Sequence, residues 1–160
     1  MSFLLMVGCE KEKEVSSLQE RNGVYYEVNS EESFTGKAVE KYPNDQKKRE
    51  GNFKNGKQDG FTTFWYENGQ KSSETIYKDG KEDGFTTSWY ENGNKKIEGI
   101  VKDGKSEGFA TSWYENGNKK YEGIVKDGES EGLITSWYEN GQKKHEGIYK
   151  DGNLVNPSNP

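Results

Sequence analysis

The 160-residue sequence contains one cysteine, one histidine and three prolines, and each low count limits the fold or the functional sites that the chain can form. A lone cysteine, Cys9, forms no disulfide within the chain, so a disulfide-stabilised fold is excluded. A lone histidine, His145, cannot supply a histidine-based acid–base pair or a multi-histidine metal site. With so few prolines against 20 glycines, we expect the turns to be built on glycine.

Hydrophobic residues are also scarce, at 28%, which on its own is typical of disordered chains. Aromatic residues nevertheless make up 13% of the sequence, too many for a solvated coil. The 23 basic and 28 acidic residues are interspersed, and no basic block is long enough to follow a phosphate backbone. We therefore expect a folded protein that does not bind nucleic acid.

No set of residues suited to catalysis is present. Ser88, Ser112 and Ser136 have no base to activate them. The segment 79–84 has the acidic character of a calcium loop, but Lys81 stands where an oxygen ligand is needed. No glycine-rich loop opens a helix to hold a phosphate. We predict that the chain is not an enzyme and has no catalytic residues, metal, cofactor or small-molecule substrate.

A repeat organises most of the chain. Trp65, Trp89, Trp113 and Trp137 follow one another at intervals of 24 residues. The repeat predicts five units, the first of which lacks the tryptophan and is typical of a capping unit. The predicted segments are a signal remnant (1–9), a flexible tether (10–20), an N-terminal capping strand region (21–35) with a strand near 24–28, units 36–59, 60–83, 84–107, 108–131 and 132–152, and a polar tail (153–160).

Each unit carries two turn signals. One is Asn-Gly, as at Asn68-Gly69, and the other is Asp-Gly, as at Asp79-Gly80. Both dipeptides tolerate the positive φ that two-residue primed turns require, and aromatic or β-branched residues flank them. The pattern predicts an all-β fold, an elongated single antiparallel sheet of tandem 24-residue β-hairpins.

Placing Asn-Gly at the hairpin turn assigns each side chain to a face. Phe85, Trp89 and Ile100 then share one face with their equivalents in the other units, and we expect this face to be the core. The equivalents are Phe61, Trp65, Ile76; Phe109, Trp113, Ile124; and Leu133, Trp137, Ile148.

The opposite face is the candidate binding surface. It carries a tyrosine column, Tyr66, Tyr90, Tyr114 and Tyr138. Beside it lie the cross-strand pairs Glu40/Arg49, Phe64/Ser73, Ser88/Ile97, Ser112/Tyr121 and Ser136/His145, of which four set a large residue against a small one. The column that includes Ile97, Tyr121 and His145 varies most between units. Such variation indicates either a recognition surface or drift at solvent-facing positions.

Two motifs resemble known families. Tyr121-Glu122-Gly123-Ile124-Val125-Lys126-Asp127-Gly128 resembles the MORN repeat, and Trp-Tyr-Glu-Asn-Gly followed by Lys-Lys resembles its bacterial variant in YwqK-like antitoxins. The resemblance covers about residues 34–152 and implies the hairpin fold. We expect a non-catalytic scaffold for an unknown protein partner, with toxin neutralisation implied by the resemblance alone. Alternatives are a carbohydrate or cell-wall binding module, and lipid headgroup binding by lysine pairs such as Lys95-Lys96.

The first nine residues are apolar up to Gly8-Cys9, and a polar run follows. This segment resembles the end of a bacterial lipoprotein signal, although no Lys or Arg precedes Cys9. The resemblance implies a lipid anchor at Cys9 and a place in the cell envelope. The alternative is a cytoplasmic protein with an incidental thiol.

The lipoprotein hypothesis makes a direct prediction. The mature protein should begin at Cys9, lack residues 1–8 and carry more than one acyl chain, because a single chain anchors poorly. Mass spectrometry of the N-terminus after expression from the full upstream reading frame measures this. A fully soluble protein with an intact N-terminus would contradict it.

Overall fold

The computed structural model describes residues 12–157, and its regular elements are almost all strands. The elements are β1 (Glu12–Glu14), the 3-10 helix η1 (Val15–Ser17), β2 (Leu18–Arg21), β3 (Val24–Glu27), β4 (Gly36–Lys41), β5 (Lys47–Lys54), β6 (Lys57–Trp65), β7 (Lys71–Lys78), β8 (Lys81–Trp89), β9 (Lys95–Lys102), β10 (Lys105–Trp113), β11 (Lys119–Lys126), β12 (Glu129–Trp137), β13 (Lys143–Lys150) and β14 (Asn153–Pro157).

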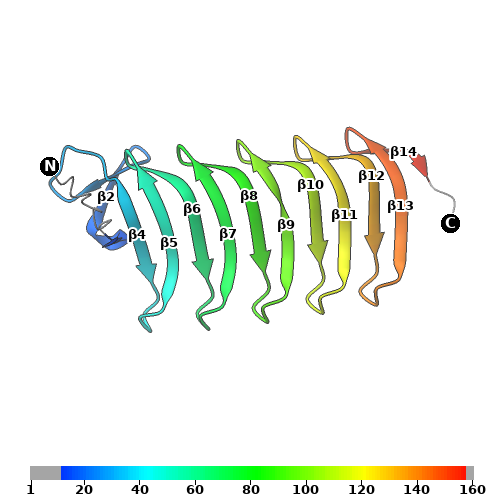
Figure 1. The fold of residues 1–160 in the computed structure, drawn as a ribbon, viewed down its shortest axis with the longest axis horizontal. Helices are drawn as coiled ribbons and strands as arrows, with labels where there is room; N and C mark the ends of the chain where they lie inside the picture. The colour runs from blue at the N-terminus through cyan, green and yellow to red at the C-terminus, as the bar shows by residue number, and fades with distance from the viewer. Residues whose placement is uncertain (1–11, 158–160) are drawn as a thin grey trace, which may run out of the picture.

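Twelve of these strands form one sheet in the order β1-β4-β5 and then consecutively to β14. All neighbours in it are antiparallel except β1 and β4. The strands lie side by side in an elongated array that runs from the N-terminal to the C-terminal end (Figure 1). The predicted all-β, single-sheet fold is confirmed. Within the described residues, no helix has the length and apolar character that crossing a membrane requires.

The two turn types differ from each other. At Asp79-Gly80 both residues have positive φ, 50° and 84°, so the predicted primed two-residue turn is confirmed there. At Asn68-Gly69 only the glycine does, at 84°, and the Tyr66 N–H donates to the Gln70 carbonyl at 2.8 Å. The primed-turn prediction is wrong here, because a three-residue loop closes the hairpin and shifts its register between Phe64 and Trp65.

The predicted cross-strand pairs are all present in the strands, on the side of that register shift away from the turn. Glu40 faces Arg49, Phe64 faces Ser73, Ser88 faces Ile97, Ser112 faces Tyr121 and Ser136 faces His145. Placing Asn-Gly in the turn was therefore enough to obtain the pairing within each hairpin.

Between hairpins the strands bulge, which the sequence pattern did not indicate. On the two sides of Ile76, Thr75 pairs with Thr86 while Tyr77 pairs with Glu82, so the β8 strand carries extra residues around Gly84. Gly84 has φ 143°, and a Cβ there would lie 2.8 Å from the Ile76 Cβ. The junctions β5–β6, β9–β10 and β11–β12 show the same register shift. Such bulges bend the strand and increase its twist.

Both ends of the chain correct our expectations. The tether predicted over 10–20 is, from Glu12 onward, β1, η1 and β2. The strand near 24–28 exists as β3, but it pairs with β2 in a separate two-stranded sheet and does not begin the array. The tail predicted over 153–160 forms β14 as far as Pro157, which pairs with β13.

The N-terminal segments pack on the first hairpin. Phe34, Ala38 and Phe53 are buried together, and the partly buried Val15, Leu18 and Tyr25 pack against them. The Tyr25 N–H also donates to the Gly56 carbonyl at 2.8 Å. These contacts cover the first unit of the array, which is the role expected of a cap.

Most of the predicted core ladder is not buried. We call the face that carries Phe61, Phe85, Phe109 and Leu133 the outer face, and these side chains are exposed. On the opposite, inner face the buried residues are Ala38, Phe53, Thr62, Thr75, Val101 and Ile134. Thr87 and Thr111 are buried on the outer face, two residues from Phe85 and Phe109. A Cβ at Gly51 of the inner face would lie 2.9 Å from the Thr62 Oγ1, so the strands pack too closely there for a residue larger than glycine at position 51. The expected core ladder is therefore wrong for its Phe and Leu members and for Ile100, Ile124 and Ile148, whereas Ile76 is half-buried.

Two equivalent glycines test the bulge. Gly84→Ala should lower the free energy of unfolding by at least about 2 kcal/mol, because the new methyl group meets Ile76 and φ is unfavourable. Gly132→Ala, where φ is 72° and nothing lies within 4 Å of the place a Cβ would take, should lose about 1 kcal/mol from backbone strain alone. Thermal and urea unfolding measure both losses. Equal losses would show that close packing at Gly84 does not matter.

Candidate binding surface

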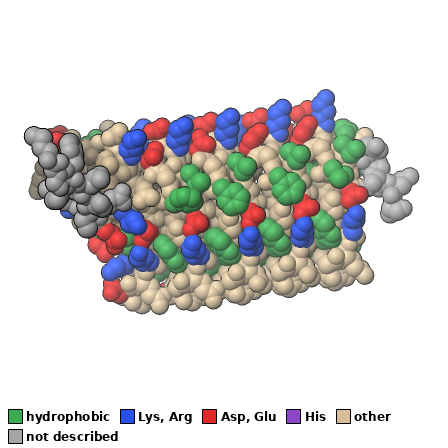
Figure 2. Space-filling view, in the orientation of Figure 1, with side chains coloured by type: hydrophobic (Ala, Val, Ile, Leu, Met, Phe, Trp, Pro, Cys, Tyr) green, Lys and Arg blue, Asp and Glu red, His purple; other side chains and the backbone are tan. Residues whose placement is uncertain are grey.

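Hydrophobic side chains form a continuous row along the outer face. We define the outer row as Phe61, Phe85, Phe109, Leu133, Ile100, Ile124 and Ile148, whose exposed fractions lie between 44% and 59%. Within a hairpin, Phe85 faces Ile100 and Phe109 faces Ile124, and each of the last three units contributes such a pair. The unit before them contributes Phe61, whose partner Ile76 is half-buried. Figure 2 shows hydrophobic side chains in rows that follow the length of the array. Exposed apolar patches of this kind mark interaction sites.

Charged residues border the outer row on both sides. Glu98 lies two residues from Ile100 on the same strand, about 6.8 Å away on the same face. On the other side, toward the Asp-Gly turns, Glu107 pairs with Ile100 and Glu131 pairs with Ile124. The outer row is therefore one residue wide along each strand.

The tryptophans lie beyond these glutamates and are covered by lysines. Lys71 Nζ lies 6.0 Å from the centre of the Trp89 ring, in the next unit, and Lys95 Nζ lies 5.7 Å from that of Trp113. Lys47 and Lys119 stack on Trp65 and Trp137 in the same way. Each tryptophan is half-buried, and its neighbouring lysine belongs to the preceding hairpin. These stacks join consecutive units.

The predicted tyrosine column is largely structural. The hydroxyls of Tyr66, Tyr90 and Tyr114 donate to the carbonyls of Trp89, Trp113 and Trp137, at 2.7, 2.8 and 2.9 Å. These three tyrosines are half-buried, whereas Tyr138 is 50% exposed. Tyr42 of the first unit, which lacks the tryptophan, makes the same bond to Trp65 at 2.8 Å.

The variable column lies on the inner face, one residue in each hairpin. Ile97 is 45% exposed, while Tyr121 and His145 are half-buried. The Tyr121 hydroxyl lies 3.2 Å from the Ser130 Oγ, and the His145 ring meets Tyr149 edge-on at 6.2 Å. Because they occupy successive hairpins, these residues form a line along the array and not one compact site.

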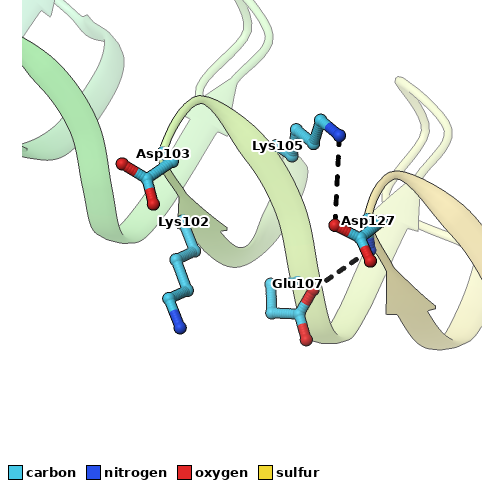
Figure 3. A pocket seen from close by; sticks show the side chains of 5 residues that line it. All are labelled: Lys102, Asp103, Lys105, Glu107 and Asp127. Atoms are coloured by element: carbon cyan, nitrogen blue, oxygen red, sulfur yellow. Dashed lines mark hydrogen bonds and ion pairs between the residues drawn. The ribbon is translucent and has the colours of Figure 1, made fainter.

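A shallow cavity of about 350 Å³ lies at the Asp-Gly turns of two units, lined by Lys102, Asp103, Lys105, Glu107 and Asp127 (Figure 3). Glu107 Oε2 accepts the Asp127 N–H at 3.0 Å, and Lys105 Nζ lies 3.9 Å from Asp127 Oδ1. These contacts link the turns to each other. Across residues 12–157, no three His, Cys, Asp or Glu side chains are grouped so as to hold a metal ion.

Several ionisable groups have shifted pKa values, and each shift reflects burial or a contact with a neighbouring side chain. Burial, followed by the nearby Glu82, raises the pKa of Tyr77 to about 12. Burial also raises the pKa of Tyr90. The hydrogen bond from Lys143 lowers the pKa of Glu146. All three shifts move the group further from neutral pH, as structural contacts do.

Comparison with known families agrees with this repeat. The MORN repeat variant matches residues 34–55, 58–79, 107–127 and 130–151, which together are more than half of the chain. The chain belongs to the MORN repeat family. MORN repeats are generally protein- or membrane-interaction repeats. In this MORN protein the segment 84–107 forms the same hairpin as the matched units, from β8 and β9. Among curated proteins, no match is found.

The tyrosine column of this MORN protein predicts a difference between two of its members. Tyr90→Phe removes the hydroxyl that bonds Trp113 and should cost about 1 kcal/mol of stability. Tyr138→Phe is the matched control, because no equivalent tryptophan carbonyl faces its hydroxyl within residues 12–157, and it should change stability by less than about 0.5 kcal/mol. Thermal unfolding compares them. A larger loss at Tyr138 would show that the inter-unit bond contributes little.

Proposed function

We propose that the chain is a non-catalytic scaffold that binds a protein partner along the outer row. The observation that carries this proposal is the exposure of Phe61, Phe85, Phe109 and Leu133, of which none is less than 48% exposed. Seven large apolar side chains on one sheet face are unfavourable in water, and covering each one stabilises a complex by about 1.5–3 kcal/mol at most.

The other two candidate ligands fit the outer face less well. The tryptophans of this face are not free to stack on a sugar, because each already has a lysine over its ring at 5.7 to 6.0 Å. An anionic lipid requires clustered lysines, but the lysine pairs are divided: Lys95 stacks on Trp113, whereas Lys96 stacks on Tyr90. A protein partner with an apolar surface is the better match.

The scaffold's location is a separate part of the proposal. We propose that Cys9, which lies outside the described residues, anchors the protein by acyl chains at a bacterial membrane surface. β1 begins at Glu12, so the anchor would lie only a few residues before the sheet. The resemblance to YwqK-like proteins favours a toxin as the partner. Cys9→Ser should release the protein from the membrane fraction and leave its fold unchanged.

Substitutions on the two faces test the scaffold. The double variant Phe85→Ser with Phe109→Ser removes the centre of the outer row and should lower recovery of the partner in co-purification at least tenfold. Because both rings are exposed, its thermal unfolding should remain close to that of the original protein. Quantitative mass spectrometry of crosslinked complexes from the host measures the recovery.

Ile97→Ser is the matched control, because Ile97 is also exposed but lies on the inner face. It should leave partner recovery unchanged. If Ile97→Ser abolishes recovery while the double phenylalanine variant does not, the partner binds the variable column. Enzymatic turnover by the purified protein would contradict the non-catalytic part of the proposal.

A further inference from the structure

The spacing of the outer row limits which partner fits it. Adjacent strands lie about 4.8 Å apart, so equivalent side chains in consecutive two-strand units lie about 9.6 Å apart. Residues seven apart on an α-helix face the same side and are separated by about 10.5 Å. A helix that lies along the array therefore presents one apolar residue to each unit with little mismatch. An extended strand in that direction repeats its side chains every 6.8 Å or so and falls out of step.

The width of the outer row also favours a helix. The row is one residue wide along each strand, because Glu98 lies beside Ile100 on one side of the row and Glu107 lies beside it on the other. An amphipathic helix has a single narrow apolar stripe, which covers such a row and leaves the flanking charges at the edge. A second sheet packed on this face would bury the glutamates as well, at a large desolvation cost.

The charges beside the outer row indicate which charged residues a partner should carry beside its apolar stripe. The nearest charged groups on the two sides are carboxylates, Glu98 and Glu122 on one and Glu107 and Glu131 on the other. The lysines that pair with Glu98 and Glu122 lie further away, over the tryptophans of the next unit. If two copies paired through their outer faces, the two-fold axis would lie either along the array or along the strands. In both arrangements the carboxylate rows of one copy would face carboxylate rows of the other. A partner with Lys or Arg beside its apolar stripe is complementary instead.

We propose that the outer row docks a basic amphipathic α-helix from another protein, lying along the array across the strands. From Phe61 to Leu133 the row spans three steps, or about 29 Å, which requires a helix of about 19 residues. Within residues 12–157 the chain has no α-helix of its own to fill this position. This inference rests on the proposed scaffold function and specifies the class of partner.

Synthetic peptides of about 21 residues test the inference. The first has leucine at the a and d positions of each heptad and lysine beside them, the second has glutamate in place of lysine, and the third is a shuffled version of the first. Fluorescence anisotropy of labelled peptide at physiological salt gives each dissociation constant. The first peptide should bind at least tenfold more tightly than either of the others.

Variants of the protein locate the binding. Phe85→Ser with Phe109→Ser should weaken binding of the first peptide at least tenfold, whereas Ile97→Ser should not change it. Glu98→Gln with Glu122→Gln should reduce the preference for lysine over glutamate flanks. Equal binding of the lysine and glutamate peptides, equal binding of the shuffled peptide, or tighter binding to vesicles of anionic phospholipid overturns the proposal.

The outcome is separable from that of the scaffold itself. If the phenylalanine variants lose the cellular partner but the first peptide does not bind, the outer row is a docking surface, and the proposal that it binds a basic helix is wrong. If the phenylalanine variants retain the cellular partner, the scaffold proposal for this face is wrong whatever the peptides do.

Discussion

Each hairpin of this sheet is stable only when it is bonded to the next one. The sheet is a single layer, and an isolated two-stranded hairpin is marginal in water. Besides the strand hydrogen bonds, three recurring contacts join neighbouring units. A tyrosine hydroxyl donates to a tryptophan carbonyl of the next unit, and a turn asparagine amide donates to a glutamate carbonyl, as from Asn92 to Glu115. In addition, a lysine ammonium lies over the tryptophan ring of the next unit. The array is therefore stabilised mainly between nearest neighbours.

The pattern of turns and pairs could be predicted from sequence because it depends on local chemistry. Asp-Gly adopts the primed turn, and the large-against-small pairs such as Ser112 and Tyr121 lie opposite each other. The bulge at Gly84 could not be predicted in this way. Its glycine follows a strand-like pattern, and only the three-dimensional approach of Ile76 shows why a side chain is excluded there.

The candidate site was harder to predict than the fold. Phenylalanine and isoleucine recurring on one face indicate a core in an ordinary two-layer protein, so the sequence predicts that Phe85 and Ile100 are buried. In a single layer neither face is covered by another layer, and the tightly packed face is the one with glycine and threonine opposite each other, as at Gly51 and Thr62. Recurrent small residues facing each other were the available signal. The tyrosines looked exposed because their hydrogen-bond partners are 23 residues away in sequence.

Because every unit has the same 24-residue length, the array can gain or lose whole units during evolution. A duplicated or deleted hairpin alters neither the turns nor the contacts of the remaining units, because each contact reaches only the adjacent one. It does alter the number of apolar pairs presented to a ligand. Avidity for a long ligand is thus adjustable in whole increments, by gain or loss of a unit, without redesign of any single contact.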